Sequence, residues 1–560
     1  MPHAAPTAPF EQPFAYDIYK QKYAHTGEEW SDTARRVATH VLAALYHAPN
    51  RGPDFVSVIE DATTRVEQLI AERRFMPGGR YLYATGRPLH QTQNCLLLRA
   101  EDSREGWADL QQKAAMALMT GAGIGVWYGD VRPAGSTITR TGGVASGPVS
   151  LMQIINEIGR HTMQGGSRRS AIWAGLPWWH ADVDAFIRIK DYPKWLRDQK
   201  AADYNTPAPL DMTNISVTLD DHFFEAYADE THADHERAVR VYRKVVDKML
   251  TTAEPGFSVD RGDKSGEVLR NACTEVTSAD DSDVCNLGSL VLSRFDDPRD
   301  FGRAVSDAVL FLTAGTLYSD LPYGAVADTR EKNRRLGLGV MGVHEFCLLR
   351  GVRYGSPEAM EAMRPFAEEY AKALDLAHHW QDRFGLSRSK GATAIAPTGT
   401  IGIVAETTTG IEPIFAAAYE RTVRDASVDG DVHRVEYVVD PTARRLVESG
   451  VDPELIEDAY SLSYDYERRF AMQHFWQQYT DHGISSTVNL PAVVRDEAEQ
   501  AEFGDVLMKY LPELRGITCY PDGARPGQPL VAVPIEVALS SDGYVVEEDE
   551  EKCVGGVCGI

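Results

Sequence analysis

Apolar residues recur at helical spacing near the N-terminus of the chain. The stretch Ser31–Tyr46 presents four apolar side chains on one face of a helix, namely Val37, Val41, Leu42 and Leu45. Ser31 stands where an N-cap residue would accept a hydrogen bond from the first helical turn. The pattern predicts a helical region over residues 1–74. Its first residues, Met1–Phe14, are rich in proline and alanine and are expected to be disordered.

From about Phe75 to Leu219, short apolar runs alternate with glycine clusters and helical stretches, which is typical of α/β organisation. The clusters are Gly121–Val126 and Thr141–Pro148. The first cluster does not meet the G-x-G-x-x-G dinucleotide fingerprint, because Val126 and Trp127 follow Gly125. A phosphate loop and a turn in which backbone packs closely on backbone both remain open for it.

A further helix is predicted between Ser356 and Gly385. Ser356-Pro357 is a cap followed by proline at the first helical position, and Gly385 is a typical stop. The apolar stripe of this helix consists of Met363, Phe366, Tyr370, Leu374 and Ala377.

The C-terminal segment differs in composition from the rest of the chain. Five acidic residues, Glu547–Glu551, precede Lys552–Ile560, which is rich in glycine. Like charges repel one another and glycine adds backbone freedom, so residues 531–560 are expected to form a flexible tail.

Length and charge narrow the classes of function. A chain of 560 residues with 43% apolar and 25% charged residues can bury a large core and has the composition of a soluble protein. Its 57 basic against 82 acidic residues leave a net charge of −25, which disfavours nucleic acid as a partner but not a small phosphorylated substrate. Neither an N-terminal signal nor an apolar run of about 20 residues is present, so we expect no membrane partner and a cytoplasmic location.

The cysteines indicate thiol chemistry rather than a disulfide framework. Their number is seven, an odd count, and their spacing is irregular. Cys553 and Cys558 lie in the tail, where the residues between them offer no further zinc ligand, so no metal site is predicted. A dithiol that cycles to a disulfide on a mobile segment explains this pair better.

Asn271, Cys273 and Glu275 alternate along the chain, and Cys285 follows ten residues later. In an extended segment, alternate side chains project to the same side. An amide that holds hydroxyl groups, a carboxylate that accepts a proton and a sulfur between them suit chemistry on a diol. The alternative, that Cys273 is a small buried residue and Glu275 a surface acid, remains open.

Small hydroxyl residues surround a glycine in Ala394–Ile401, after an apolar run. Such a segment can offer the amide groups of Thr398, Gly399, Thr400 and Ile401 at the start of a helix as a phosphate cradle. An ordinary strand-to-helix turn is the alternative.

Taken together, these segments resemble the catalytic large chain of the ribonucleotide reductases, from about Phe75 to Asp522. The further matching segments are Asn94-Cys95, Thr141–Ser150, Gln164–Arg169, Arg335–Gly342, Ala396–Ile401 and Thr409–Pro413. The resemblance implies an α/β fold over residues 75–530. This would be a ten-stranded α/β barrel of two parallel five-stranded halves set antiparallel, with Cys273 on a central finger loop and the N-terminal helical domain beside it.

The resemblance also implies roles in reducing ribonucleotides to deoxyribonucleotides. Cys273 would become a thiyl radical that takes the 3′ hydrogen of the substrate, Glu275 would take the 3′-hydroxyl proton, and Asn271 would orient the sugar hydroxyls. Cys95 and Cys285 would supply the reducing equivalents. Cys553 and Cys558 would restore that pair and be reduced in turn by a thioredoxin or glutaredoxin-like protein.

Two loops would bind nucleotides. Thr398–Ile401 matches the family's substrate phosphate loop. Six residues resemble the loop that links a deoxynucleotide or ATP effector to substrate choice: Gln164, Gly165, Gly166, Ser167, Arg168 and Arg169. Diphosphate and triphosphate substrates remain open, as do a monomer and a homodimer.

The chain departs from the family's pattern at several points. The usual Asn-Pro-Cys-Gly-Glu reads Asn271-Ala272-Cys273-Thr274-Glu275, and nothing before Phe75 resembles the ATP-binding cone of many relatives. Cys347 and Cys519 match no functional position and are expected to be structural.

The source of the radical is the remaining question. Tyr520-Pro521 stands where a partner-dependent chain has two successive tyrosines, which resembles the adenosylcobalamin-dependent class. We therefore expect adenosylcobalamin as the cofactor. The alternatives are a class I large subunit that receives its radical from a separate metal-containing subunit, a glycyl-radical enzyme, and a non-catalytic nucleotide-binding regulator.

Overall fold

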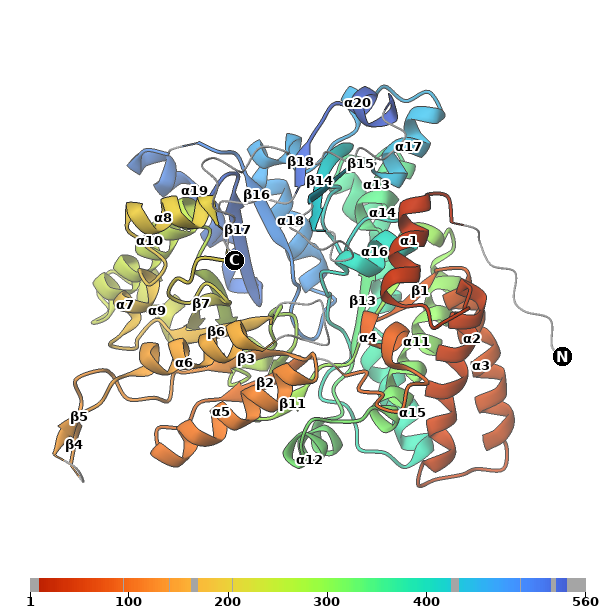
Figure 1. Ribbon diagram of the computed structural model, residues 1–560, viewed down its shortest axis with the longest axis horizontal. Coiled ribbons are helices and arrows are strands. Elements are labelled where there is room, and N and C mark those ends of the chain that lie inside the picture. Colours follow the sequence, from red (N-terminus) through yellow and green to blue (C-terminus); the bar gives the residue numbers. More distant parts are fainter. Residues whose placement is uncertain are drawn as a thin grey trace, which may run out of the picture.

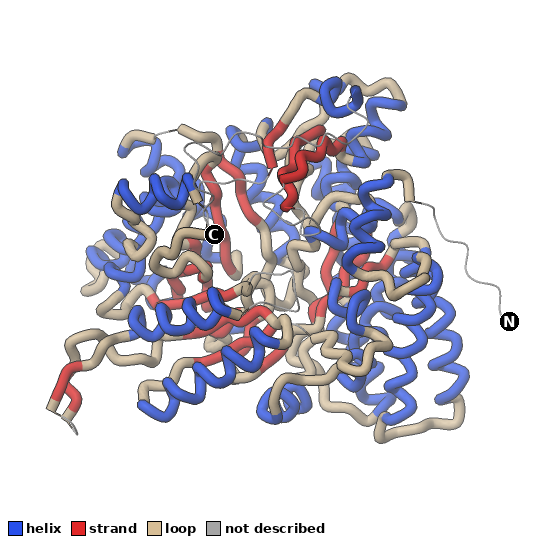
Figure 2. Tube along the Cα trace, viewed as in Figure 1, coloured by secondary structure: helices blue, strands red, loops and turns tan. Residues whose placement is uncertain are grey.

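In this computed structural model, the structure describes residues 10–93, 95–139, 142–162, 170–203, 205–424, 433–493, 495–524 and 530–540. Strands run through the middle of the molecule and helices cover them on both sides (Figure 2). Among the described residues, no helix is long and apolar enough to cross a membrane.

Three helices follow one another near the N-terminus: α1 (Pro13–Lys22), α2 (Trp30–Ala43) and α3 (Phe55–Ala71). They pack with α11 (Pro298–Tyr318) into one apolar core (Figure 1). Because α1 begins at Pro13 and Phe10 stacks on Tyr19, the expectation of disorder is wrong for residues 10–14. The predicted cap is also wrong: Glu29 caps α2 in a reciprocal capping box with Asp32, so that Ser31 lies inside the helix.

The first half of the barrel consists of five mutually parallel strands: β2 (Cys95–Arg99), β3 (Gly123–Trp127), β6 (Ile172–Pro177), β7 (Thr213–Asp220) and β8 (Gly256–Asp260). The helices of this half are α5 (Arg104–Met119), α6 (Pro148–His161), α7 (Val183–Ile187), α8 (Lys194–Ala202), α9 (Asp221–Ala228) and α10 (His235–Thr252). The apolar core between these strands and helices is continuous. A short arm of β4 (Thr137–Ile138) and β5 (Gly143–Val144) extends away from it (Figure 1).

The second half is also parallel but less regular. β12 (Leu287–Val291) pairs with β13 (Gly337–Met341), and single bridges continue the sheet through Leu338↔Thr393 and Ile395↔Ile484. β16 (Thr487–Leu490), in the same chain segment as Ile484, then pairs in parallel with β17 (Gly516–Pro521). The larger helices of this half are α11, α12 (Gly324–Asn333), α13 (Val343–Leu349), α14 (Pro357–Tyr370), α15 (Ala373–Phe384), α16 (Gly399–Ala405), α18 (Tyr466–Gln477) and α19 (Glu497–Tyr510).

The two halves meet antiparallel at both edges. β17 pairs with β8 on one side, and β11 (Asp283–Val284) pairs with β2 on the other. Only Cys285 and Asn286 separate β11 from β12, so this chain segment belongs to both halves. The pairings therefore follow the predicted ten-stranded order of two parallel five-stranded halves, and the expected α/β fold is confirmed.

Smaller elements complete the barrel. β1 (Phe75–Pro77) pairs with β12, α4 (Gly79–Ala84) follows it, and β14 (Ala418–Arg424) forms a three-stranded sheet with β15 (His433–Val439) and β18 (Leu530–Ala532). α17 (Pro441–Glu448) and α20 (Ile535–Ser540) lie near that sheet (Figure 1). Folded structure thus continues to residue 540, ten residues past the predicted boundary at 530, and residues 541–560 lie outside the described part.

Candidate active site

A hairpin carries the predicted radical cysteine into the barrel. β9 (Leu269–Arg270) pairs with β10 (Thr277–Ser278), and β9 contacts β2, β3 and β6. Residues 271–276 form the tip. Thr274 turns the chain with a φ of 69° and donates its amide to the Asn271 carbonyl at 3.0 Å. The Asn271 side-chain oxygen accepts the Val276 amide at 3.0 Å. Asn271 therefore closes the tip whose middle residue is Cys273.

Two glycines of β3 allow the hairpin to pack closely against this strand. A Cβ at Gly125 would lie 2.0 Å from the Arg270 carbonyl oxygen, and one at Gly123 would lie 2.9 Å from the Ala272 Cβ. Both distances are too short for a side chain, so this strand tolerates only glycine there. Of the two readings of Gly121–Gly125, backbone packed closely on backbone is the one that the structure supports.

Cys95 and Cys285 meet below the tip. Side chains of β2 alternate: Leu96 and Leu98 enter the outer core, whereas Cys95 and Leu97 join a small inner cluster with Cys285. The Cys285 amide donates to the Cys95 carbonyl at 2.9 Å, and neither cysteine forms a disulfide. Burial raises the pKa of the Cys285 thiol well above its usual range, and the contact with Cys95 raises it further. The Cys285 thiol is therefore held in its neutral form beside Cys95, and both cysteines are buried.

Glu275 is fully buried, so it is not the surface acid of the alternative reading. Within the described residues, neither of its carboxylate oxygens has a hydrogen-bond partner, and the side-chain nitrogen of Asn271 has none either. Burial raises the pKa of the Glu275 carboxyl from 4.5 to about 7, against smaller opposing effects of its own backbone amide and of Asn271. Hydroxyl groups of a ligand could satisfy these two buried polar groups.

We predict that Glu275→Gln stabilises the fold in a pH-dependent way. A folded pKa above the unfolded one means that ionisation costs the folded state about 3 kcal/mol once the pH exceeds 7. Glutamine removes this cost. The variant should gain up to roughly 3 kcal/mol in free energy of unfolding at pH 8 and nothing near pH 4, where the parent carboxyl is neutral in both states.

Denaturant unfolding of the two proteins at both pH values measures this difference. An equal difference at pH 4 and pH 8 would contradict the assignment of a raised pKa to Glu275.

A buried ionic network anchors the base of the hairpin. Arg335 donates from Nε to Asp283 and from Nη2 to Glu267, both at 2.8 Å. Ser278 Oγ donates to Asp283 at 2.7 Å, and Thr277 Oγ1 donates to Glu267 at 2.5 Å. Asp283 lies two residues before Cys285, so the network fixes the hairpin that carries Cys273 relative to Cys95 and Cys285. Its members were not predicted, because each is an ordinary charged or hydroxyl residue in the sequence.

The predicted phosphate segment forms a strand-to-helix turn. Residues 393–395 run along the barrel, and α16 begins at Gly399 after Thr398, which has a φ of 50°. Thr398 Oγ1 accepts the Gly410 amide at 2.8 Å. The amides of Gly399, Thr400 and Ile401 belong to the first helical turn, which has no intrahelical acceptor for them. Ala394, just before this turn, packs in the cluster that holds Cys95 and Cys285.

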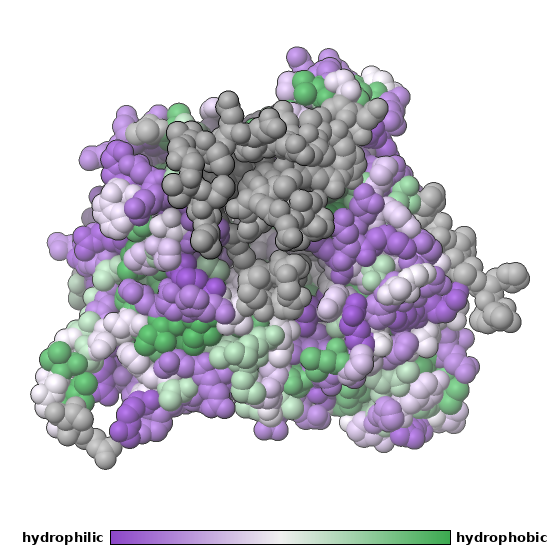
Figure 3. All heavy atoms as spheres, in the orientation of Figure 1, coloured by the Kyte–Doolittle hydropathy of each residue, from purple (hydrophilic) through white to green (hydrophobic). Residues whose placement is uncertain are grey.

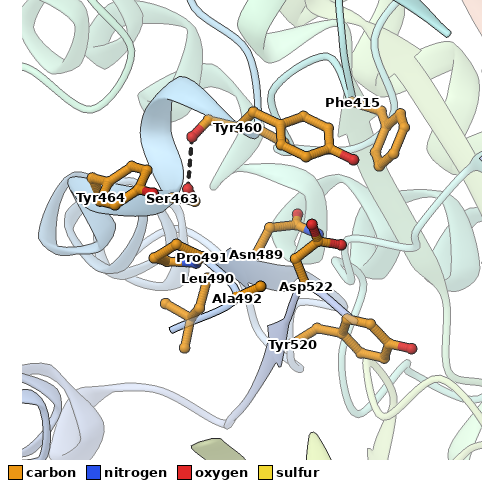
Figure 4. Close-up of a pocket in the computed structure, with 11 residues that line it drawn as sticks. Phe415, Tyr460, Ser463, Tyr464, Asn489, Leu490, Pro491, Ala492, Tyr520 and Asp522 are labelled. Atoms are coloured by element: carbon orange, nitrogen blue, oxygen red, sulfur yellow. Dashed lines mark hydrogen bonds between the residues drawn. The ribbon is translucent and has the colours of Figure 1, made fainter. Parts of the chain in front are cut away.

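A pocket opens at the carboxyl ends of β16 and β17 (Figure 4). Val488, Leu490, Ile517 and Cys519 enter the outer core, so the alternate side chains of these strands, among them the registered pair Asn489 and Tyr520, face the other way. The pocket has a volume of about 280 Å³. Its lining includes Phe415, Tyr460, Tyr464, Asn489, Tyr520 and Asp522, and the Phe415 and Tyr460 rings lie 5.4 Å apart. Only Tyr520 of these was singled out in the sequence.

Several predicted site residues lie outside the described part of the chain. They are Cys553 and Cys558 of the tail, Gln164–Arg169 of the effector loop, and Asn94 before Cys95. Cys347 and Cys519 are described and fully buried, and burial raises the pKa of each thiol to about 12, as suits structural residues.

The fold and the site define a barrel protein that encloses a thiol-bearing hairpin over a buried dithiol. The family described as "Ribonucleotide reductase, barrel domain" matches residues 93–252, 268–377 and 376–512. The chain belongs to the ribonucleotide reductase family.

Individual relatives cover most of the chain. The vitamin B12-dependent ribonucleoside-diphosphate reductase of Mycobacterium tuberculosis is 27% identical over 551 residues, which span 88% of this chain and 75% of that protein. The enzyme of the same name from Thermoplasma acidophilum is 27% identical over 540 residues, spanning 86% and 68%.

Two solved structures share the fold. A B12-dependent (class II) ribonucleotide reductase has a TM-score of 0.69 and 16% identity, covering 95% of this chain and 94% of that one. The class Id ribonucleotide reductase alpha subunit of Actinobacillus ureae has a TM-score of 0.71 and 16% identity, covering 91% and 97%. At this identity they support the architecture and not the class.

Proposed function

We propose that this chain reduces ribonucleotides to 2′-deoxyribonucleotides by thiyl-radical chemistry with adenosylcobalamin as cofactor. The observation that carries the proposal is the convergence of Cys273, Glu275, Cys95 and Cys285 inside one barrel. Relatives over 86–88% of the chain are named vitamin B12-dependent ribonucleoside-diphosphate reductases, which supports the reaction and the cofactor.

Residues of the hairpin tip activate the sugar. The Cys273 sulfur, as a thiyl radical, takes the 3′ hydrogen atom of the ribose. Glu275 accepts the 3′-hydroxyl proton, and its raised pKa suits a group that must take and return a proton near neutrality. The unpaired amide nitrogen of Asn271 donates to a sugar hydroxyl and so orients the ring.

The dithiol performs the reduction. Cys95 and Cys285 together give two electrons and two protons, the 2′-hydroxyl leaves as water, and one disulfide remains. The hydrogen atom held by Cys273 then returns to the 3′ carbon, which restores the radical. The raised pKa of the Cys285 thiol suits this step, because no thiolate charge has to be buried there.

The residues around the site fit adenosylcobalamin. Cys273 is only half-buried although its neighbours Ala272 and Glu275 are buried, so its side chain remains accessible. The rings of Phe415, Tyr460 and Tyr464 would contact one edge of a flat ring system, because the pocket at β16 and β17, at about 280 Å³, has room for only part of the cofactor. When bound, the cofactor supplies the homolytic chemistry by which Cys273 loses its hydrogen atom. No Asp-x-His-x-x-Gly segment is present in the sequence, so we propose that no histidine of this chain replaces the cofactor's lower base.

The nucleotide itself would be held and selected by two further segments. The first-turn amides of α16, at Gly399, Thr400 and Ile401, would bind the substrate phosphates. Gln164–Arg169 would bind a deoxynucleotide or ATP effector.

Apolar side chains on α5 and α6 are exposed, among them Met116, Met119 and Ile154, and this face supports a homodimer (Figure 3). Reduced thiols favour a cytoplasmic location.

The tail would connect the site to an external reductant of the thioredoxin or glutaredoxin type. Cys553 and Cys558 would attack the Cys95–Cys285 disulfide by thiol–disulfide exchange. We predict that deletion of Glu551–Ile560 stops product formation after about one equivalent per chain when thioredoxin is the reductant. A small dithiol that diffuses into the barrel should restore repeated turnover, because the inner cysteines are untouched.

Rapid-quench product analysis with pre-reduced enzyme tests this step and the proposed function together. Mass spectrometry should find a Cys95–Cys285 disulfide after one turnover in the deletion variant, whereas in the parent thiol exchange should pass the disulfide on to Cys553 and Cys558. Full thioredoxin-driven activity of the deletion variant would remove the tail from the reaction, and absence of the disulfide would contradict the proposed reduction.

A further inference from the structure

We propose that His222, His232 and Asp234 form a site for a divalent transition metal, best suited to zinc, on the outer side of the barrel. His222 is the second residue of α9, and the other two lie in the turn between α9 and α10. Among the described residues, this is the one group of three or more such side chains whose donor atoms lie close enough to share an ion. The sequence predicts no such site, because the ligands are ten and two residues apart and match no zinc spacing.

The donor atoms are nearly at metal spacing. All three lie within 4.8 Å of one another, and His222 Nε2 lies 3.4 Å from Asp234 Oδ2. Four ligands at zinc–nitrogen and zinc–oxygen distances of about 2.0–2.1 Å stand about 3.4 Å apart in a tetrahedron. The His222–Asp234 pair already has this separation. The two imidazole rings are in edge-on contact, with their centroids 5.2 Å apart at 61°.

The donor set selects the metal. Two imidazole nitrogens and one carboxylate oxygen suit zinc and its neighbours, whereas calcium and magnesium prefer oxygen ligands alone. The side chains are exposed or half-buried, so water can complete the coordination.

The surroundings hold the first ligand in place. The His222 ring packs 5.4 Å from that of Trp178, which is fully buried. Trp178 Nε1 donates to Asp220 at 2.8 Å, and Asp220 caps α9 by accepting the Phe223 amide. This chain of contacts fixes the start of the helix that carries His222.

One hydrogen bond in the turn competes with metal binding. His232 Nδ1 accepts the Asp234 amide at 3.1 Å. When His232 binds the metal, this hydrogen bond is lost and a metal–nitrogen bond forms. The amide of the half-buried Asp234 then donates to water. The site touches none of Cys95, Cys273, Cys285 or Glu275, so its metal would brace the α9–α10 turn and take no part in turnover.

The test uses the cobalamin-free full chain with Cys553→Ser and Cys558→Ser, which removes tail thiols that could also bind zinc. Zinc chloride is titrated against a chromophoric chelator. Because loss of an outer-shell partner alone costs a metal site about 10- to 100-fold in affinity, His222→Ala and His232→Ala should each weaken binding at least as much. X-ray absorption of the zinc-loaded chain should show nitrogen and oxygen neighbours without sulfur.

His235→Ala is the matched control. His235 is the first residue of α10 and directly follows Asp234, but its Nδ1 is bonded to the Ala226 carbonyl at 2.9 Å and it is not part of the group. This variant should bind zinc as the parent does. Equal affinity and stoichiometry in the parent, His222→Ala and His232→Ala would overturn the proposal, as would an equal loss in His235→Ala. None of these measurements depends on the proposed function.

Discussion

Cys273→Ser is expected to fold, bind nucleotide and form no deoxynucleotide above background. A hydroxyl holds its hydrogen atom much more strongly than a thiol does, so the serine oxygen cannot be converted to the radical that takes the 3′ hydrogen. A barrier higher by only about 4 kcal/mol already lowers the rate about 1,000-fold, and we expect a loss of at least that size. Product quantification under anaerobic conditions, with nucleotide binding and thermal unfolding measured alongside, tests the expectation.

Thr274→Gly provides the matched control on the same tip. Thr274 has a φ of 69°, a conformation that glycine adopts without strain, and the substitution restores the residue usual in the family. This variant should keep activity within a few-fold of the parent. Substantial turnover in Cys273→Ser would displace Cys273 from the centre of the reaction, whereas loss of activity in both variants would show that the tip tolerates no change.

The alternating side chains were the most informative part of the sequence. Asn271, Cys273 and Glu275 share one hairpin tip, but this tip is a turn with a positive φ at Thr274 and not the extended segment that their spacing predicts. Cys95 shares an inner cluster with Cys285. What spacing alone could not decide was whether Glu275 is buried. That depends on Gly483, whose amide donates to the Glu275 carbonyl at 2.7 Å from a segment over 200 residues away.

Local sequence signals predicted where helices and strands lie better than they predicted where each of them begins and ends. Ser356 caps α14 and Gly385 ends α15 as predicted, yet the single helix expected between them is broken by a turn at residues 371–372. Pro365 lies inside α14, the first of the two pieces. Both α14 and α15 pack on α11. Likewise, β18 orders residues 530–532 by pairing with β14, a contact over about 110 residues that the acidic composition of the tail does not reveal.

The arginine and carboxylate groups at the base of the hairpin could not be predicted from the sequence, for a related reason. Arg335 and Asp283 are both almost fully buried, and their charges are tolerable because they pair with each other. Arg335 also pairs with Glu267, and Asp283 also accepts hydrogen bonds from Ser278 and Asn333. In the sequence, Arg335 and Asp283 resemble ordinary charged surface residues. Only the fold shows that they connect the start of β13 with the segment that carries Cys285.

The purified chain, alone and anaerobic, should reduce ribonucleotides once adenosylcobalamin and a dithiol are added, and should show no product without the cofactor. Tyr520 is the sole tyrosine of β17 and is followed by Pro521, so this strand offers no pair of successive tyrosines for a stepwise transfer of the radical. A cofactor docked beside the half-buried Cys273 needs no such path. Electron paramagnetic resonance should then show a cobalt signal coupled to a sulfur radical, and Cys273→Ser should lack it.

Tyr520→Phe separates the two routes of radical generation. Phenylalanine keeps the ring that lines the pocket at β16 and β17 but removes the hydroxyl that a tyrosine radical requires. With adenosylcobalamin, this variant should retain activity within about tenfold of the parent, because the hydroxyl carries no electron. If Tyr520→Phe is inactive, or if the parent works only when a second, metal-containing protein is added, the chain remains a ribonucleotide reductase but its radical comes from a partner. The barrel, the hairpin and the inner dithiol serve either route, so the distinction rests on this strand.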